Sequence, residues 1–173
     1  MNRKHTIEEY CEKLKKLKKV KPNIEFSSDF IIGYPGETNN DFEATTKLMH
    51  SVKFINTYSF VFSPRPGTPA FGLQKISKED AKNRLTKFQK IAGEIKINYR
   101  KKLINTTGLV LFENKIKNEN KYFGRDEYAN SVIVESNNEN LNGKIKSIKI
   151  LSVNHNTLFG KIVHDNNQKN CAA

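Results

Sequence analysis

Apolar residues at helical spacing predict two capped helices in the first 52 residues. One follows Thr6, which forms a capping-box pattern with Glu9, and Pro22 closes it. Thr38 and Asp41 begin the other helix, whose apolar residues share one side. Lysines fill the remaining face of the first helix, so we expect that face to be solvated.

Two apolar runs flank the second helix and predict strands. Residues 24–32 become apolar on both faces in their later half, which is typical of a strand buried in a parallel sheet. Residues 58–62 form the second run. Strand, helix and strand joined by short loops predict a right-handed parallel βαβ unit.

The pattern changes period near residue 103. A long helix is expected from Ser77, with an apolar stripe that includes Ala81, Leu85 and Phe88. Short apolar runs separated by Gly108, Gly124 and Asn-rich turns follow it, and these runs are 109–112, 131–134, 145–153 and 158–163. Four or five short strands in so short a stretch predict a small β-barrel of the kind that includes oligonucleotide binders.

The predicted fold class is therefore α/β followed by all-β. We place an α/β piece at residues 1–103, a small OB-like β-barrel at 104–164 and a disordered tail at 165–173. The barrel should fold by itself. Two parallel strands cannot close a barrel, so residues 1–72 should be marginal without a partner.

Charge and cysteine content narrow the possible functions. The chain carries 30 basic and 18 acidic residues, for a net charge of +12, which favours a nucleic-acid partner or, equally, a solvated lysine-rich surface. No apolar run is long enough for a membrane span or a secretory signal, so we expect a cytoplasmic protein. Cys11 and Cys171 are the only cysteines, too few for a disulfide framework, a structural zinc site or an iron–sulfur cluster.

Two unusual loops follow the predicted parallel strands, at residues 33–38 and 63–70. Ligands of α/β folds bind at the carboxyl ends of strands, so both loops should face one site. Gly33 permits close backbone approach, Glu37 could bind a ribose or amino group, and Arg65 between two prolines could meet an anion. The simpler interpretation is that these residues only make turns, with Arg65 capping a strand end.

Three motifs resemble those of radical-SAM methylthiotransferases, and most closely those of the MiaB type. They lie in order at residues 1–6, 27–38 and 58–70. Gly124-Arg125-Asp126 followed by Asn130 is similar to the signature of the TRAM domain, the small barrel with which this family holds tRNA. The resemblance covers roughly the last two fifths of a typical member. It implies methylthiolation of isopentenyladenosine beside the tRNA anticodon, with tRNA as partner.

The resemblance also implies site residues. The S-adenosylmethionine pocket of a partial (β/α) barrel would be lined by Ile32, Gly33, Glu37, Ser63 and Arg65. Phosphates of tRNA would meet Arg125, the best individual candidate, together with Lys115, Lys117, Lys144, Lys146 and Lys149. An unpaired base could stack on Tyr122, Phe123 or Tyr128. For any single lysine, an ordinary outward strand position is the alternative.

Members of this family use two 4Fe–4S clusters held by cysteines that this sequence lacks. We therefore expect no catalysis by this chain alone, and no catalytic or metal-binding residue is assigned. The chain would be the C-terminal portion of such an enzyme, with a separately encoded N-terminal half as a possible partner. The alternatives are a free-standing TRAM-type tRNA-binding protein and a decayed gene remnant.

Overall fold

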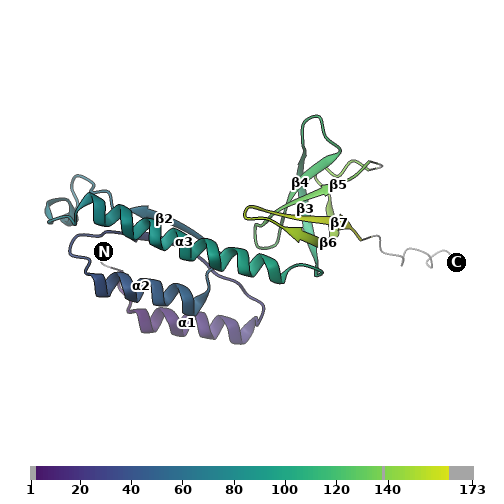
Figure 1. The fold of residues 1–173 in the computed structure, drawn as a ribbon. Helices are drawn as coiled ribbons and strands as arrows, with labels where there is room; N and C mark the ends of the chain where they lie inside the picture. The colour runs from purple at the N-terminus through teal and green to yellow at the C-terminus, as the bar shows by residue number, and fades with distance from the viewer. Residues whose placement is uncertain (1–2, 138, 164–173) are drawn as a thin grey trace. The chain divides into compact units, whose positions relative to one another are not determined.

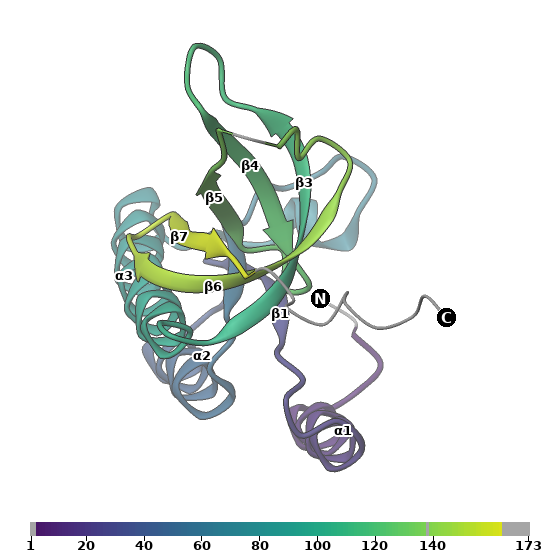
Figure 2. The ribbon, with the colours of Figure 1, turned by 90° about the vertical axis from the view of Figure 1, so that its right-hand side faces the viewer.

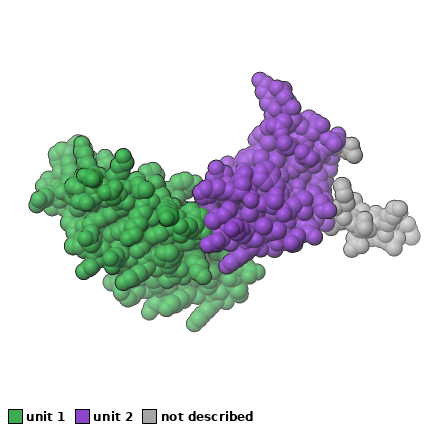
Figure 3. Space-filling model, viewed as in Figure 1, with its two compact units in different colours: residues 1–95 green, residues 96–173 purple. Residues whose placement is uncertain are grey.

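The structure is a computed structural model that describes residues 3–137 and 139–163 (Figure 1). The elements of this part are α1 (Ile7–Val20), β1 (Ser27–Ile32), α2 (Asn39–Val52), β2 (Asn56–Val61), a 3₁₀ turn (Pro69–Gly72), α3 (Lys78–Lys102), β3 (Thr107–Lys115), β4 (Lys121–Asp126), β5 (Ser131–Glu135), β6 (Ile145–Val153) and β7 (Thr157–Ile162). The chain divides into two compact units, residues 1–95 (unit 1) and 96–173 (unit 2), coloured separately in Figure 3. The tail expected at 165–173 lies outside the described residues. No helix in the described ranges combines the length and apolar character needed to cross a bilayer.

Unit 1 contains the predicted βαβ unit. Strands β1 and β2 pair in parallel, from Ser27 opposite Asn56 to Ile32 opposite Val61, and α2 connects them. One face of this two-stranded sheet packs into a core formed by Ile32, Phe42, Met49, Phe54 and Phe88, the last of which comes from α3. The parallel arrangement predicted from the sequence is confirmed.

Both predicted capping boxes are present. The Thr6 hydroxyl accepts from the Glu9 amide at 3.2 Å, and the Glu9 carboxylate accepts from the Thr6 amide at 3.0 Å. Thr38 and Asp41 repeat this arrangement at the start of α2, with distances of 3.2 and 2.9 Å. Each box satisfies amide donors that have no partner in the first helical turn.

The opposite face of the β1–β2 sheet is open. Tyr58 is 66% exposed and Phe60 58% exposed, and Ile31 is exposed beside Phe60. The prediction of a strand buried on both faces is therefore wrong for the described residues, because the core lies on one face of the sheet only. An apolar face of this kind marks a surface that a ligand or a further protein segment can cover.

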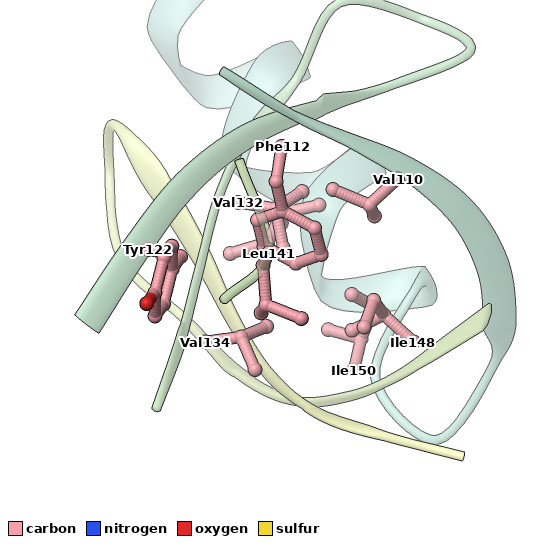
Figure 4. Close-up of a cluster of buried hydrophobic side chains, with 9 residues drawn as sticks. Val110, Phe112, Tyr122, Val132, Val134, Leu141, Ile148 and Ile150 are labelled. Atoms are coloured by element: carbon pink, nitrogen blue, oxygen red, sulfur yellow. The ribbon is translucent and has the colours of Figure 1, made fainter. Parts of the chain in front are cut away.

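Unit 2 contains a closed barrel with strand order β3-β4-β5-β7-β6 (Figure 2). All neighbours are antiparallel except β5 and β7, which run parallel. The barrel encloses apolar side chains contributed by every strand, with Leu141 from the β5–β6 connection among them (Figure 4). The predicted small barrel is confirmed.

Strand β4 was missed by the sequence prediction, which treated Gly124 as a turn residue. Gly124 instead lies inside β4, opposite Phe112 of β3. A Cβ atom at this position would lie 2.4 Å from the Leu111 carbonyl oxygen, so only glycine lets the two strands approach this closely. The glycine therefore serves strand packing.

Candidate functional site

The loops that follow β1 and β2 line one open cleft in unit 1, as predicted. Its volume is about 840 Å³, and its walls include Ile31, Tyr34, Phe62, Ser63 and Arg65. The rings of Tyr34 and Phe62 meet edge to face with centroids 5.0 Å apart, so each loop supplies one aromatic wall. The cleft can therefore hold a flat, partly apolar group against aromatic side chains.

Ser63 and Arg65 are the two predicted cofactor residues that line this cleft. The Arg65 carbonyl accepts from the Thr68 hydroxyl at 2.8 Å, which closes the turn around Gly67, where φ is +80°. Within the described residues, the Arg65 guanidinium forms no ion pair. It is therefore available to an anionic group bound in the cleft.

The other three predicted cofactor residues point elsewhere. The Ile32 side chain is buried in the unit 1 core. Gly33 packs against α3, where a Cβ would lie 3.1 Å from Ala81. Glu37 accepts from the Gly33 amide at 3.0 Å through Oε2, and its other oxygen faces Arg84. Gly33 and Glu37 fix the loop behind the cleft to α3, and the side chains of Ile32 and Glu37 do not line the cleft.

Arg84 was not found by sequence reasoning. It donates to the Glu37 carboxylate at 2.7 Å, to the Glu37 carbonyl at 2.9 Å and to Asn39 at 2.8 Å. Its signal in the sequence is an arginine within the apolar stripe of α3, three residues after Ala81 and four before Phe88. A charged residue in such a position needs a polar partner when the stripe is buried.

No group of metal-binding side chains gathers within the described ranges. Cys11 is the single described cysteine, on α1, and Cys171 lies outside these ranges. An iron–sulfur cluster needs several thiolate ligands, so the described residues do not fit such a group.

The signature around Arg125 forms an ordered corner in unit 2. Asp126 accepts from the Tyr128 amide at 2.9 Å and from both nitrogens of Asn130 at 2.8 and 2.9 Å. Asn130 is 1% exposed, and the buried Arg100 from the end of α3 donates to its side-chain oxygen at 3.5 Å and to the His155 carbonyl. Burial lowers the pKa of Arg100, and the nearby Asp126 carboxylate opposes this shift. Packing explains Gly124, and the hydrogen bonds of the turn explain Asp126 and Asn130. Arg100 was not predicted from the sequence.

Arg125 points outward from the barrel. Its Nε donates to Glu113 at 3.1 Å, and its guanidinium lies over the Phe123 ring at 5.3 Å. This combination presents a flat, oriented cation that can meet a phosphate or a stacked base. The pairing with Glu113 offsets its charge in the free protein.

Two further predicted RNA contacts are also paired. Lys144 and Lys146 both reach Oε1 of Glu139, at 3.0 and 2.8 Å. These bonds, led by Lys146, lower the pKa of Glu139. They join Lys144 and Lys146 to the connection that carries the buried Leu141.

The remaining predicted contacts differ from one another. Lys115 lies over the Tyr122 ring at 5.9 Å, and Lys117 is exposed in the β3–β4 hairpin. Lys149 lies on the outside of β6. Tyr122 is buried in the barrel core, so it is not free to stack on a base.

Comparisons with known proteins find relatives that match nearly the whole chain. No family model matches it. Over 169 residues, or 98% of the chain, it is 50% identical to the tRNA-2-methylthio-N(6)-dimethylallyladenosine synthase of Pelagibacter ubique. Enzymes of the same name from Wolbachia pipientis wMel and Ehrlichia ruminantium are 40% and 45% identical over 95% of the chain. The chain spans 38%, 38% and 37% of the length of these three relatives.

Proposed function

We propose that the chain is the tRNA-holding portion of a tRNA-2-methylthio-N(6)-dimethylallyladenosine synthase. It belongs, as a C-terminal part, to the tRNA methylthiotransferases that these relatives represent. Identity of 50% along 98% of the chain carries this proposal. The closed barrel with outward basic side chains supports it, because small barrels of this kind present their outer strands to nucleic acid.

In this proposal unit 2 is a TRAM-type barrel that binds tRNA. Arg125 is presented by a buried hydrogen-bonded corner, which fixes where its guanidinium lies. Lysines on the outer strands add charge without base specificity. The barrel would position the tRNA, while other parts of the enzyme act on the adenosine.

Unit 1 would supply one side of an S-adenosylmethionine site. The aromatic wall of Tyr34 and Phe62 suits an adenine ring, and Ser63 and Arg65 offer polar groups at the rim. Gly33 and Glu37 would act by shaping the loop, and Ile32 by packing β1 into the core. When bound in such an enzyme, S-adenosylmethionine supplies the radical chemistry of the family.

The two iron–sulfur clusters of the family would be held by other protein segments. The whole sequence has two cysteines, fewer than one such cluster requires. We therefore expect no methylthiolation by this chain alone, and activity would require a cysteine-bearing N-terminal half as a partner.

Binding of tRNA by the purified chain tests the proposal directly. We expect the chain to bind tRNA at low salt. The logarithm of its affinity should fall linearly with the logarithm of the salt concentration, because phosphate contacts release counterions. The Arg125→Ala variant should bind more weakly than a Lys78→Ala variant, which changes an exposed residue of α3 in unit 1. Absence of tRNA binding at low salt would contradict the proposal.

The closed barrel also favours a second candidate, a free-standing tRNA-binding protein. Its core is complete within unit 2, so RNA binding would not require another chain. Co-purification with the cysteine-bearing N-terminal half of a relative separates the two. Stable association supports the enzyme portion, whereas tRNA binding without association supports the free-standing protein.

A further inference from the structure

Two lysines lie directly opposite each other on the outside of the barrel. Lys149 of β6 pairs with Lys161 of β7 in the antiparallel register. Ile148 and Ile150, the neighbours of Lys149, are buried in the core, so alternation along the strand directs Lys149 outward. The exposed Lys161 shares that face, and Thr107 of β3 extends the same row.

Neither lysine of this pair has a carboxylate partner within the described residues, a property that they share with Lys115 and Lys117. Arg125 pairs with Glu113, Lys121 with Glu119, and Lys144 and Lys146 with Glu139. Among residues 3–137 and 139–163, neither Lys149 nor Lys161 forms an ion pair. Across β3, β6 and β7 the outward row is Thr107, Lys149 and Lys161. On the other side of β7, Glu135 of β5 follows Val134, the partner of Gly160, but it forms no ion pair with Lys161 within the described residues.

Like charges directly opposite on neighbouring strands destabilise a sheet. Two unneutralised ammonium groups at such positions therefore cost stability in the free protein. A bound polyanion removes that cost, because its phosphates can lie beside both ammonium groups.

We propose that Lys149 and Lys161 form a phosphate-binding pair that contacts the backbone of the bound RNA. The inference rests on the proposed function and assigns the RNA backbone to the β3–β6–β7 face of the barrel. Arg125 lies on a different part of the barrel, because it belongs to β4 and is paired with Leu111 of β3 and Ser131 of β5. Lysine side chains act here as flexible point charges, so the pair recognises phosphodiesters without reading sequence.

The variants Lys149→Gln and Lys161→Gln test the pair in the full chain. Each should lower tRNA affinity about threefold at moderate salt, and each should reduce the slope of log affinity against log salt by about one. The double variant should lower the slope by about two. Thermal unfolding should stay at the wild-type temperature or rise, because a like-charge contact is removed.

Lys121→Gln is the matched control, since Lys121 is already neutralised by Glu119 at 2.7 Å. Equal effects of the control and the two test variants on affinity and salt slope would overturn the proposal. A lowered unfolding temperature with an unchanged salt slope would overturn it too, because that result means a structural role. If the wild-type chain binds tRNA and the double variant binds equally, only this inference fails. If the wild-type chain does not bind tRNA at low salt, the proposed function fails with it.

Discussion

Arg84 on α3 holds Glu37 by two hydrogen bonds, one to its carboxylate at 2.7 Å and one to its carbonyl at 2.9 Å. Because Glu37 in turn accepts from the Gly33 amide, this contact fixes the loop that follows β1 to the helix behind it. Both side chains are largely buried, at 14% and 12% exposure, so water competes poorly for these groups. The wall of the cleft in unit 1 therefore depends on a residue far away in the sequence.

Replacing Arg84 by methionine should destabilise unit 1. The Glu37 carboxylate would lose its charged donor, at a cost of about 1.5–3 kcal/mol. Hydrogen exchange of amides in β1 and α2 would measure the loss. Lys82→Met, at an exposed position of α3, is the control and should leave exchange unchanged. Equal exchange in both variants would show that the contact contributes nothing.

Two glycines of the barrel should respond oppositely to alanine. At Gly124 the added Cβ would lie 2.4 Å from a backbone oxygen of β3, so overpacking should cost about 1–3 kcal/mol or more. At Gly108 nothing lies within 4 Å of the added atom, and Gly108→Ala should be neutral or stabilising by up to about 1 kcal/mol. Chemical denaturation followed by circular dichroism compares the two. A similar midpoint for both variants would contradict the packing role of Gly124.

Unit 2 should lose stability in acid through Glu139. Hydrogen bonds from Lys146 and Lys144 hold the pKa of this carboxyl below its ordinary value of 4.5. A lowered native pKa means that the stabilisation is complete at neutral pH and is lost as pH falls through that lowered value. Glu139→Gln should therefore unfold more easily than wild type at neutral pH, and the difference should shrink as the pH falls below about 5. Glu127→Gln, at an exposed carboxylate, should show no such convergence.

Removing Glu113 should strengthen tRNA binding. Its carboxylate lies 3.1 Å from Arg125 and competes with phosphate for the guanidinium. Glu113→Gln frees that cation, and we expect a gain of about two- to fivefold in affinity at low salt, fading as salt screens the charge. The control Glu135→Gln also removes one negative charge, at a position opposite Lys121, and it should increase tRNA affinity less. Equal gains would show that net charge alone matters.

Arg100 should be required for the barrel corner. Replacing it by methionine leaves the Asn130 side-chain oxygen and the His155 carbonyl without their donor, which costs about 1–3 kcal/mol. The neighbouring exposed Lys101 provides the control, Lys101→Met. Unfolding midpoints that match between the two variants would contradict this role.

Local patterns in the sequence predicted most of the fold. The capping residues Thr6 and Thr38 identified two helix starts, because these signals act within one turn of the chain. Strand β4 was missed because the reason for Gly124 is a neighbouring strand, which no local pattern contains. Glycine inside a strand and glycine in a turn look alike in a single sequence.

The site was predicted at the level of loops and less well at the level of side chains. Both loops line one cleft, since strand ends of a parallel pair meet at one edge. The direction of Ile32 and Glu37 depends on α3, and the sequence does not show which face of the loop that helix covers. The same limit hid Arg84 and Arg100, whose partners are distant in the chain.

The position of β7 in the barrel also affects how the protein is made. This strand is the last one within the described residues, yet it lies between β5 and β6 and supplies Leu158 to the core. Strands β3, β4 and β5 can pair as soon as they leave the ribosome, because they are neighbours along the chain. The ring cannot close until β7 has emerged as well, so unit 2 completes folding only when nearly all of the described chain has been synthesised.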